Sequence, residues 1–162
     1  MNIYIAASFC YEDKKKTSER KYIIEKTVER LKTVIPGNNR YYIPHQLVIP
    51  NAWDISMEEW AKAVYEHDIR KLMEADLVIF LSFGKENNAG SVWEIGFVVG
   101  RAVGHVEEHS NDITDIVMIK MTDQIESLML TNSIDRIISE KEIETYDWAK
   151  MPVYKTELEK LS

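Results

Sequence analysis

The chain has 162 residues, of which 45% are hydrophobic and 29% charged, and its formal net charge is −7. This length suits a single domain over residues 1–162 that buries roughly two-thirds of its unfolded surface. The acidic balance argues against a nucleic-acid partner, which would need clustered lysine and arginine. No stretch reaches the ~18 apolar residues of a membrane helix, and the chain starts directly in a strand, so we expect a cytoplasmic protein without a membrane partner.

Strand and helix patterns alternate along the chain. Apolar runs predict strands at residues 3–7, 41–43, 77–81 and 113–121. Helices are predicted at residues 18–33, from a capping box of Ser56 and Glu59 to Met73, and at 90–103. A polar surface loop is expected at residues 104–112, and a short helix with a last strand within residues 124–138.

This alternation predicts an α/β fold. We expect a doubly wound, flavodoxin-like parallel sheet of five strands with helices on both faces and right-handed crossovers. Residues 44–54 form a loop too long and irregular to be a plain connector, so it is expected to carry function. The single cysteine, Cys10, fits a reducing compartment, and we expect it to be a small packed side chain.

Two carboxylates, Asp68 and Glu94, lie at either end of the apolar run at residues 77–81. Ligands of open α/β sheets bind outside the carboxyl ends of the strands. Glu94 is predicted in the first turn of the helix that follows this strand, and should therefore point into the cleft. A carboxylate at that place is a candidate for chemistry at an electrophilic carbon.

Several segments, in order, resemble the nucleoside 2-deoxyribosyltransferases. Most of the chain is covered by them: Ile3-Tyr4-Ile5-Ala6, Asp68, Ala75-Asp76, Gly90-Ser91-Val92-Trp93-Glu94-Ile95-Gly96-Phe97, Leu128-Met129-Leu130-Thr131-Asn132-Ser133, and Tyr146-Asp147-Trp148 with Met151-Pro152. The resemblance implies exchange of nucleobases at the anomeric carbon of 2-deoxyribose, with 2′-deoxynucleosides and free nucleobases as partners. We expect no cofactor and no metal ion.

The same resemblance implies roles for individual residues. Glu94 would be the nucleophile, because a carboxylate stabilises an oxocarbenium-like transition state and can capture the sugar covalently. Asp68 would supply a proton to the leaving base or hold a sugar hydroxyl. Tyr4 occupies the position at which the family places a tyrosine against the nucleophile, and could orient Glu94.

Other side chains are candidates for substrate binding. Phe9 and Trp53 could stack on a base, whereas Trp93 is expected to pack against the sheet. Gln46 could recognise a base edge through its amide. The matched segments add Gly90 and Met129, and the resemblance implies that the Met129 segment reaches the pocket of a neighbouring subunit. We therefore expect a homodimer or higher homo-oligomer with shared active sites.

Two positions depart from the transferase pattern. Asn88 stands where the transferases usually have an aspartate, and Ser127 where they have an asparagine. Together with Ser8, both changes favour the related 2′-deoxynucleoside 5′-phosphate N-hydrolases, which place small hydroxyl residues around a phosphate. Those enzymes also carry an arginine near the N-terminal loop, whereas residues 8–13 contain none. A catalytically silent nucleotide-binding domain is the third alternative.

Overall fold

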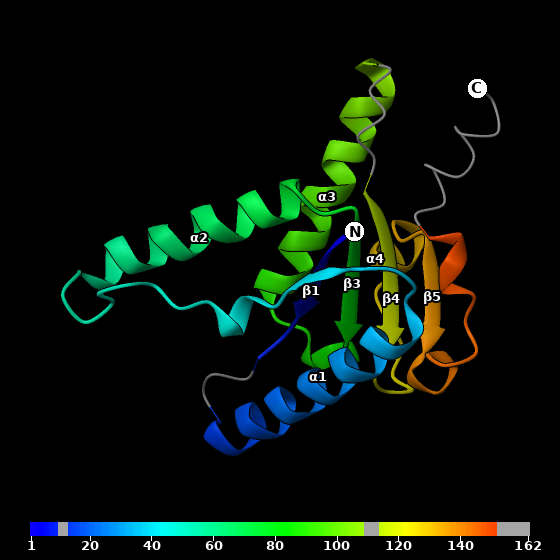
Figure 1. Ribbon diagram of the computed structural model, residues 1–162, viewed down its shortest axis with the longest axis horizontal. Helices are drawn as coiled ribbons and strands as arrows, with labels where there is room; N and C mark the ends of the chain where they lie inside the picture. Colours follow the sequence, from blue (N-terminus) through cyan, green and yellow to red (C-terminus); the bar gives the residue numbers. More distant parts are fainter. Residues whose placement is uncertain (10–12, 109–113, 152–162) are drawn as a thin grey trace.

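The computed structural model describes residues 1–9, 13–108 and 114–151 (Figure 1). For residues 103–108 it describes the backbone only. All five strands are parallel, in the order β2-β1-β3-β4-β5. The strands are β1 Asn2–Ala7, β2 Arg40–Tyr42, β3 Leu77–Ser82, β4 Asp115–Lys120 and β5 Arg136–Ser139. This order confirms the predicted flavodoxin-like α/β fold.

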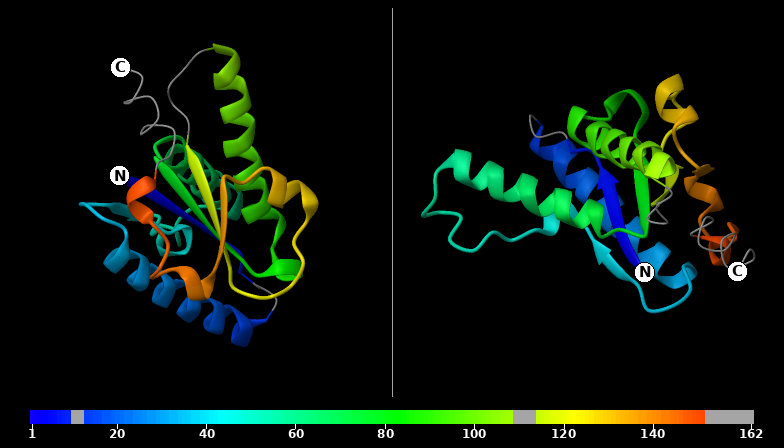
Figure 2. Two further views of the ribbon diagram at one scale, coloured as in Figure 1. Left: turned by 90° about the vertical axis from the view of Figure 1, so that its right-hand side faces the viewer. Right: turned by 90° about the horizontal axis from the view of Figure 1, so that it is seen from above.

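Helices cover both faces of the sheet (Figure 2). They are α1 Lys14–Val34, α2 Met57–Met73, α3 Ala89–Glu108 and α4 Leu128–Asn132, with 3₁₀ turns at Pro44–Gln46, Gly84–Glu86, Glu140–Glu142 and Trp148–Lys150. One core joins α1 to the sheet through residues such as Ile24 and Leu31. The opposite core joins α2, α3 and α4 through Leu72, Ile95 and Leu130. Side chains of successive strand residues enter these two cores alternately.

Local signals in the sequence explain where the helices begin. Asp13 caps α1 by accepting hydrogen bonds from the backbone of Lys15 and Lys16 at 2.9 and 3.1 Å. Ser56 and Glu59 form the predicted reciprocal capping box of α2. No helix among residues 1–9, 13–108 and 114–151 is both long enough and apolar enough to cross a membrane.

Several predicted boundaries were wrong. α1 begins at residue 14 rather than 18, because Asp13 is its cap and the three lysines belong to its first turn. α3 continues to Glu108, so the residues from 104 to 108 are helical and not part of a surface loop. Their polar composition misled the prediction, since polar residues occur in helices as well as in loops. Cys10, residues 109–113 and Pro152 lie outside the described part of the chain.

The sheet order creates a crevice between β1 and β3. The chain passes from β1 to one side of the sheet for β2, and then to the other side for β3. At such a switch point the connections leave the carboxyl edge in opposite directions and open a space. In this protein these connections lead from β1 to α1 on one face and from β3 to α3 on the other. Helix α2 projects past the sheet edge, above the loop that follows β2 (Figure 1).

Candidate active site

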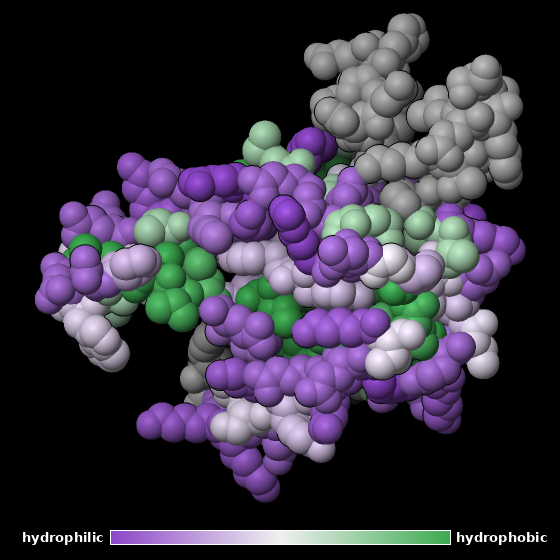
Figure 3. Space-filling model, viewed as in Figure 1, coloured by the Kyte–Doolittle hydropathy of each residue, from purple (hydrophilic) through white to green (hydrophobic). Residues whose placement is uncertain are grey.

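A cavity of about 380 Å³ lies at this crevice and contains both predicted carboxylates. It is lined by Ile5, Ala7, Phe9, Pro44, His45, Leu47, Trp60, Val64, Asp68, Asn88, Gly90, Ser91 and Glu94. We call it the carboxylate cavity. In Figure 3, hydrophobic side chains border a hollow between projecting α2 and the body of the protein. The lining is therefore mainly apolar, with a small group of polar side chains, as is typical of small-molecule sites.

Glu94 enters the cavity from α3 and is held by a tyrosine from the sheet. The hydroxyl of Tyr4, which is fully buried on β1, donates a hydrogen bond to Glu94 Oε1 at 3.0 Å. Burial raises the pKa of the Glu94 carboxyl to about 8, and the nearby charge of Asp68 acts in the same direction, while the Tyr4 hydrogen bond opposes it. Glu94 lies in the second turn of α3, not the first as predicted, since the helix already begins at Ala89.

Asp68 faces the same cavity from α2 and has a tyrosine of its own. Tyr42, at the end of β2, donates a hydrogen bond from its hydroxyl to Asp68 Oδ1. Burial raises the pKa of Asp68, and the Tyr42 hydrogen bond opposes this shift. Tyr4 and Tyr42 are partners in the β1–β2 register, and their ring centroids are 5.2 Å apart. The sheet thus presents two neighbouring phenols, each to one carboxylate.

The first turn of α3 is fixed by hydrogen bonds at the cavity wall. Asn88 Oδ1 accepts from the backbone N–H of Ser91 at 2.9 Å, which is the geometry of an N-cap. The backbone N–H of Asn88 donates in turn to Ser8 Oγ at 2.8 Å. Ser8 and Ser91, both buried, share a hydrogen bond through their hydroxyls. These contacts tie the end of β1 to the start of α3 and so position Glu94.

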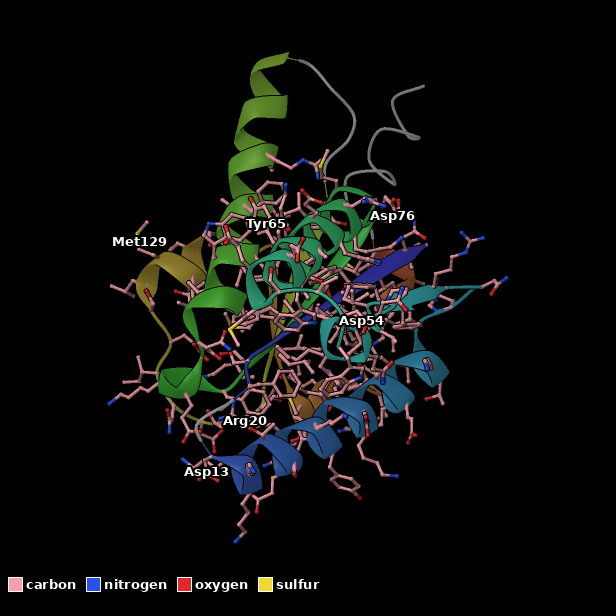
Figure 4. The ribbon with its side chains drawn as sticks, turned by 90° about the vertical axis from the view of Figure 1, so that its left-hand side faces the viewer. Asp13, Arg20, Asp54, Tyr65, Asp76 and Met129 are labelled. Carbon is pink, nitrogen blue, oxygen red and sulfur yellow. The ribbon has the colours of Figure 1, made fainter. Side chains whose placement is uncertain are left out.

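The cavity holds two carboxyl groups and no fixed positive charge among its described lining residues. None of its described lining residues is a lysine or arginine. The nearest guanidinium in this network is that of Arg20 on α1, which is buried, donates to the carbonyl of Ser8 at 3.2 Å and pairs with Glu86. In Figure 4, Arg20 lies near the end of α1 that begins at Asp13. Its charge is therefore neutralised within the protein.

Comparison with known protein families matches most of the chain. The sequence profile of the nucleoside 2-deoxyribosyltransferase family matches residues 3–129, which include both carboxylates. The chain belongs to this family. The same range contains Tyr4, Tyr42 and the whole carboxylate cavity, whereas the tail with Trp148 lies beyond it.

Solved structures show the same fold. A 2-deoxyribosyltransferase from the psychrotolerant bacterium Bacillus psychrosaccharolyticus superposes with a TM-score of 0.64 at 20% identity, over 94% of this chain and 96% of that one. A conserved protein from Enterococcus faecalis V583 gives a TM-score of 0.59 at 16% identity, over 90% and 95% of the two chains. Among curated proteins, none matches the chain significantly.

The structure brings together six of the nine residues predicted for a deoxyribosyltransferase site. Five of them line the cavity: Phe9, Asp68, Asn88, Gly90 and Glu94. The sixth, Tyr4, reaches the site through its hydrogen bond to Glu94. Gln46 is exposed and outside the lining. Ser127 and Met129 are exposed around α4 and line a different cavity, and Met129 points outward at the edge of the molecule (Figure 4).

Two tryptophans differ from expectation. Trp53 is 99% exposed and lies outside the cavity lining. Trp93 does not pack against the sheet, because it faces outward from α3 and stacks on Phe97 with a centroid distance of 5.6 Å. The tryptophan that lines the cavity is Trp60 of α2. Its place eight residues before Asp68, two helical turns along one face, was the signal that sequence analysis could have used.

Other residues of the site were not predicted. His45 lines the cavity and packs edge-on against Phe9, with the two ring centroids 4.8 Å apart. Burial lowers the pKa of its imidazole, and Lys21 adds to this effect. Tyr42 and Arg20 were not considered, because a single tyrosine on an edge strand and a single arginine on a helix carry no spacing signal.

A second cavity of about 520 Å³ lies on a different side of α3. We call it the α3–α4 cavity, and it is lined by Gly84, Lys85, Asn87, Val92, Ile95, Gly96, Val99, Ile125, Glu126, Ser127, Met129, Leu130 and Ser133. It is larger than the carboxylate cavity, but its one carboxylate, Glu126, receives hydrogen bonds from Ser82 and Asn87. The carboxylate cavity is therefore the better candidate for an active site, because it holds two carboxylates whereas both oxygens of Glu126 are already hydrogen-bonded.

Proposed function

We propose that this protein transfers 2-deoxyribose between nucleobases by cleaving the N-glycosidic bond of 2′-deoxynucleosides, with Glu94 as the covalent nucleophile. The observation that carries the proposal is the pair of carboxylates, Glu94 and Asp68, in one cavity at the switch point, each hydrogen-bonded to a tyrosine. Such a pair is the usual machinery for displacement at an anomeric carbon with retention of configuration.

The first displacement forms an ester with Glu94. A carboxylate oxygen attacks the anomeric carbon, the bond to the base breaks, and its electron pair leaves with the base, which takes up a proton. The Tyr4 hydroxyl donates a hydrogen bond to Oε1, which leaves Oε2 as the attacking oxygen. Positive charge that develops on the sugar favours the ionised form of Glu94, which offsets the raised pKa of the empty site.

The second displacement regenerates the enzyme. A ring nitrogen of an incoming base attacks the anomeric carbon, and the bond to Glu94 breaks with its electrons returning to the carboxylate. The proton released by that nitrogen returns by the route that the first base used. Trp60, Phe9 and Leu47 offer apolar and aromatic surface for flat bases, which is the type of contact that tolerates one base in exchange for another.

The described cavity fits an unphosphorylated sugar. Two carboxylates and no lysine or arginine line it, so a 5′-phosphate would meet repulsion. The second candidate is a 2′-deoxynucleoside 5′-monophosphate N-glycosidase, which the hydroxyl pair of Ser8 and Ser91 favours. Those hydroxyls already bond to each other and to Asn88, which argues for the transferase.

One assay separates these functions. Thymidine or deoxyinosine is incubated with free adenine, and deoxynucleoside monophosphates are incubated in parallel. We expect deoxyadenosine to form faster than free deoxyribose. A kcat/KM at least about tenfold higher for a monophosphate would instead establish the hydrolase, since that ratio corresponds to about 1.4 kcal/mol of preference. Binding of nucleosides without any cleavage would indicate a silent binding domain.

A further inference from the structure

A second tyrosine stands behind the carboxylate cavity, and its hydroxyl is not used by the reaction above. Tyr42 is the last residue of β2, and its hydroxyl donates to Asp68 Oδ1 across the gap between the sheet edge and α2. Its ring packs between Tyr4 at 5.2 Å and His67 at 5.3 Å. The phenol is therefore fixed on both sides before it reaches the carboxylate.

The direction of this hydrogen bond is also fixed. Burial raises the pKa of Tyr42 well above its ordinary value, and the charges of Asp68 and Glu94 act in the same direction. Tyr42 thus keeps its hydroxyl proton at any working pH and is available as a donor. An ionised Asp68 can only accept, so it receives this hydrogen bond through Oδ1, and its Oδ2 is the oxygen that the described contacts leave available to a ligand.

We propose that Tyr42 is a positioning residue that acts through Asp68. It holds one oxygen of the carboxylate so that the other faces the sugar or the leaving base, and it keeps Asp68 from turning toward Glu94. This inference rests on the proposed function for its catalytic consequence, but the coupling of Tyr42 to Asp68 is testable without any reaction.

The surroundings of Asp68 support a positioning role. The titratable groups that face it are Tyr42 from β2, Tyr4 from β1, Glu94 from α3 and its neighbour His67 on α2. Among these, only Tyr42 donates a hydrogen bond to Asp68 in the described structure. A carboxylate next to a second carboxylate needs such a donor, because otherwise the pair would share a proton and rotate.

The preceding residue on the same strand offers a matched control. Tyr41 faces the other side of the sheet, where it packs against the α1 core, and its hydroxyl bonds to no carboxylate among the described residues. Tyr41→Phe and Tyr42→Phe thus delete the same atom from adjacent positions of one strand. Only the second deletion removes a contact of the site.

The experiment is a double-mutant cycle of Tyr42→Phe and Asp68→Asn on base exchange. If Tyr42 acts through Asp68, Tyr42→Phe lowers kcat about 10- to 50-fold in the wild type but has almost no effect in the Asp68→Asn background. Tyr41→Phe stays within about twofold of wild type, as expected for a position without substrate contact. Losses that simply add would show that Tyr42 is structural, and an active Tyr42→Phe would remove it from the site.

A second measurement does not depend on activity. In protein with ¹³C-labelled aspartate, the Asp68 carboxyl signal is assigned by its absence in Asp68→Asn. We expect this signal to titrate about one pH unit higher in Tyr42→Phe than in the wild type. A lost hydrogen bond of about 1.4 kcal/mol corresponds to one unit. An unchanged titration would overturn the inference. If no glycosidic cleavage occurs but this shift is seen, the proposed function fails while the coupling stands. Thermal unfolding checks that Tyr42→Phe folds. A change in the Tyr42 ring signal of Asp68→Asn tests the contact between Tyr42 and Asp68 with the hydroxyl intact.

Discussion

The carboxylate cavity and the α3–α4 cavity lie on different sides of one helix, and each contains glutamate. Glu126 in the α3–α4 cavity is 9% exposed, and both its oxygens accept hydrogen bonds from Ser82 and Asn87. These contacts join the β3–α3 loop to the segment after β4. Glu94 has one oxygen bonded to Tyr4, and the described contacts leave the other to the cavity.

Under the proposed function, this difference separates a structural carboxylate, Glu126, from the nucleophile, Glu94. Burial occurs at both sites, so burial alone does not identify a catalytic acid. The distinguishing features are an oxygen that faces a cavity and a second carboxylate, Asp68, near enough to help raise the pKa of Glu94. The four predictions that follow test this contrast, beginning with the largest expected effect.

The largest effect should come from substituting Glu94. Glu94→Gln is expected to fold and to lose about 10³-fold or more in glycosidic cleavage, because the covalent route is removed and several kcal/mol of barrier return. A slow 2-fluoro sugar analogue should add its mass to the wild type but not to this variant. The measurement is initial rate of base exchange together with intact-protein mass spectrometry.

Glu126→Gln is the matched control from the other cavity. It should keep base exchange within a few-fold and lower the free energy of unfolding by about 1–2 kcal/mol, since an amide nitrogen would face the Asn87 side chain. Activity of Glu94→Gln within about tenfold of wild type would remove Glu94 from the mechanism, because a difference of about 1.4 kcal/mol is too small for loss of a nucleophile.

The second prediction concerns what the α3–α4 cavity is for. Ile125, Leu128 and Met129 are 85%, 79% and 82% exposed, an apolar group that a monomer would leave in water. We expect a two-fold dimer in which this segment completes the neighbour's carboxylate cavity. Mixing Glu94→Ala with Ser127→Trp protein should then restore up to about a quarter of wild-type activity, the share of intact sites in randomly mixed dimers.

Light scattering supplies the control for that mixture. The protein should be at least a dimer at micromolar concentration, and refolded mixtures should contain heterodimers. A monomer, or heterodimers without recovered activity, would mean that each chain builds its site alone and that the two cavities are functionally separate.

The contrast between the two cavities also shows how far a sequence can lead. The sheet order and the cores were predictable because parallel strands are continuous apolar runs, as in β3, where all six residues are buried. Glu94 and Asp68 were found from their place next to such a run. These features are local, and local patterns determine them.

The remaining parts of the site were not predictable because they depend on side chains meeting across the fold. Tyr42 and Asp68 are 26 positions apart, and nothing in the spacing of the sequence indicates that they touch. The contact of Tyr4 with Glu94, 90 positions apart, was expected only from the family resemblance. Trp53 lies in the turn before α2 and is exposed, whereas Trp60 belongs to α2 and lines the cavity.

The third prediction uses Asn88, which both caps α3 and lines the carboxylate cavity. Aspartate caps helices as well as asparagine, so Asn88→Asp should keep stability while adding an acid beside the leaving base. We expect base exchange at about pH 6 to rise by up to about tenfold, within the range of general acid catalysis. Asn88→Ala should instead lose about 1 kcal/mol of stability with the cap. An Asn88→Asp protein that unfolds early would show that the cap argument is wrong.

The smallest effect is the pH dependence of stability that Glu94 causes. The pKa of this carboxyl is raised from 4.5 to about 8 in the folded protein. Between these values the folded state holds a proton that the unfolded state releases, so this contribution to stability is complete below pH 4.5 and is lost as the pH rises through about 8.

Glu94→Gln has no such proton. Its thermal unfolding temperature should equal that of the wild type near about pH 5 and exceed it near about pH 9, by an amount that corresponds to about 1–2 kcal/mol after allowance for partial solvent exposure. Glu126→Gln should show no crossing of this kind. Parallel pH curves for Glu94→Gln and the wild type would mean that Glu94 titrates normally, and the distinction drawn between the two cavities would then rest on geometry alone.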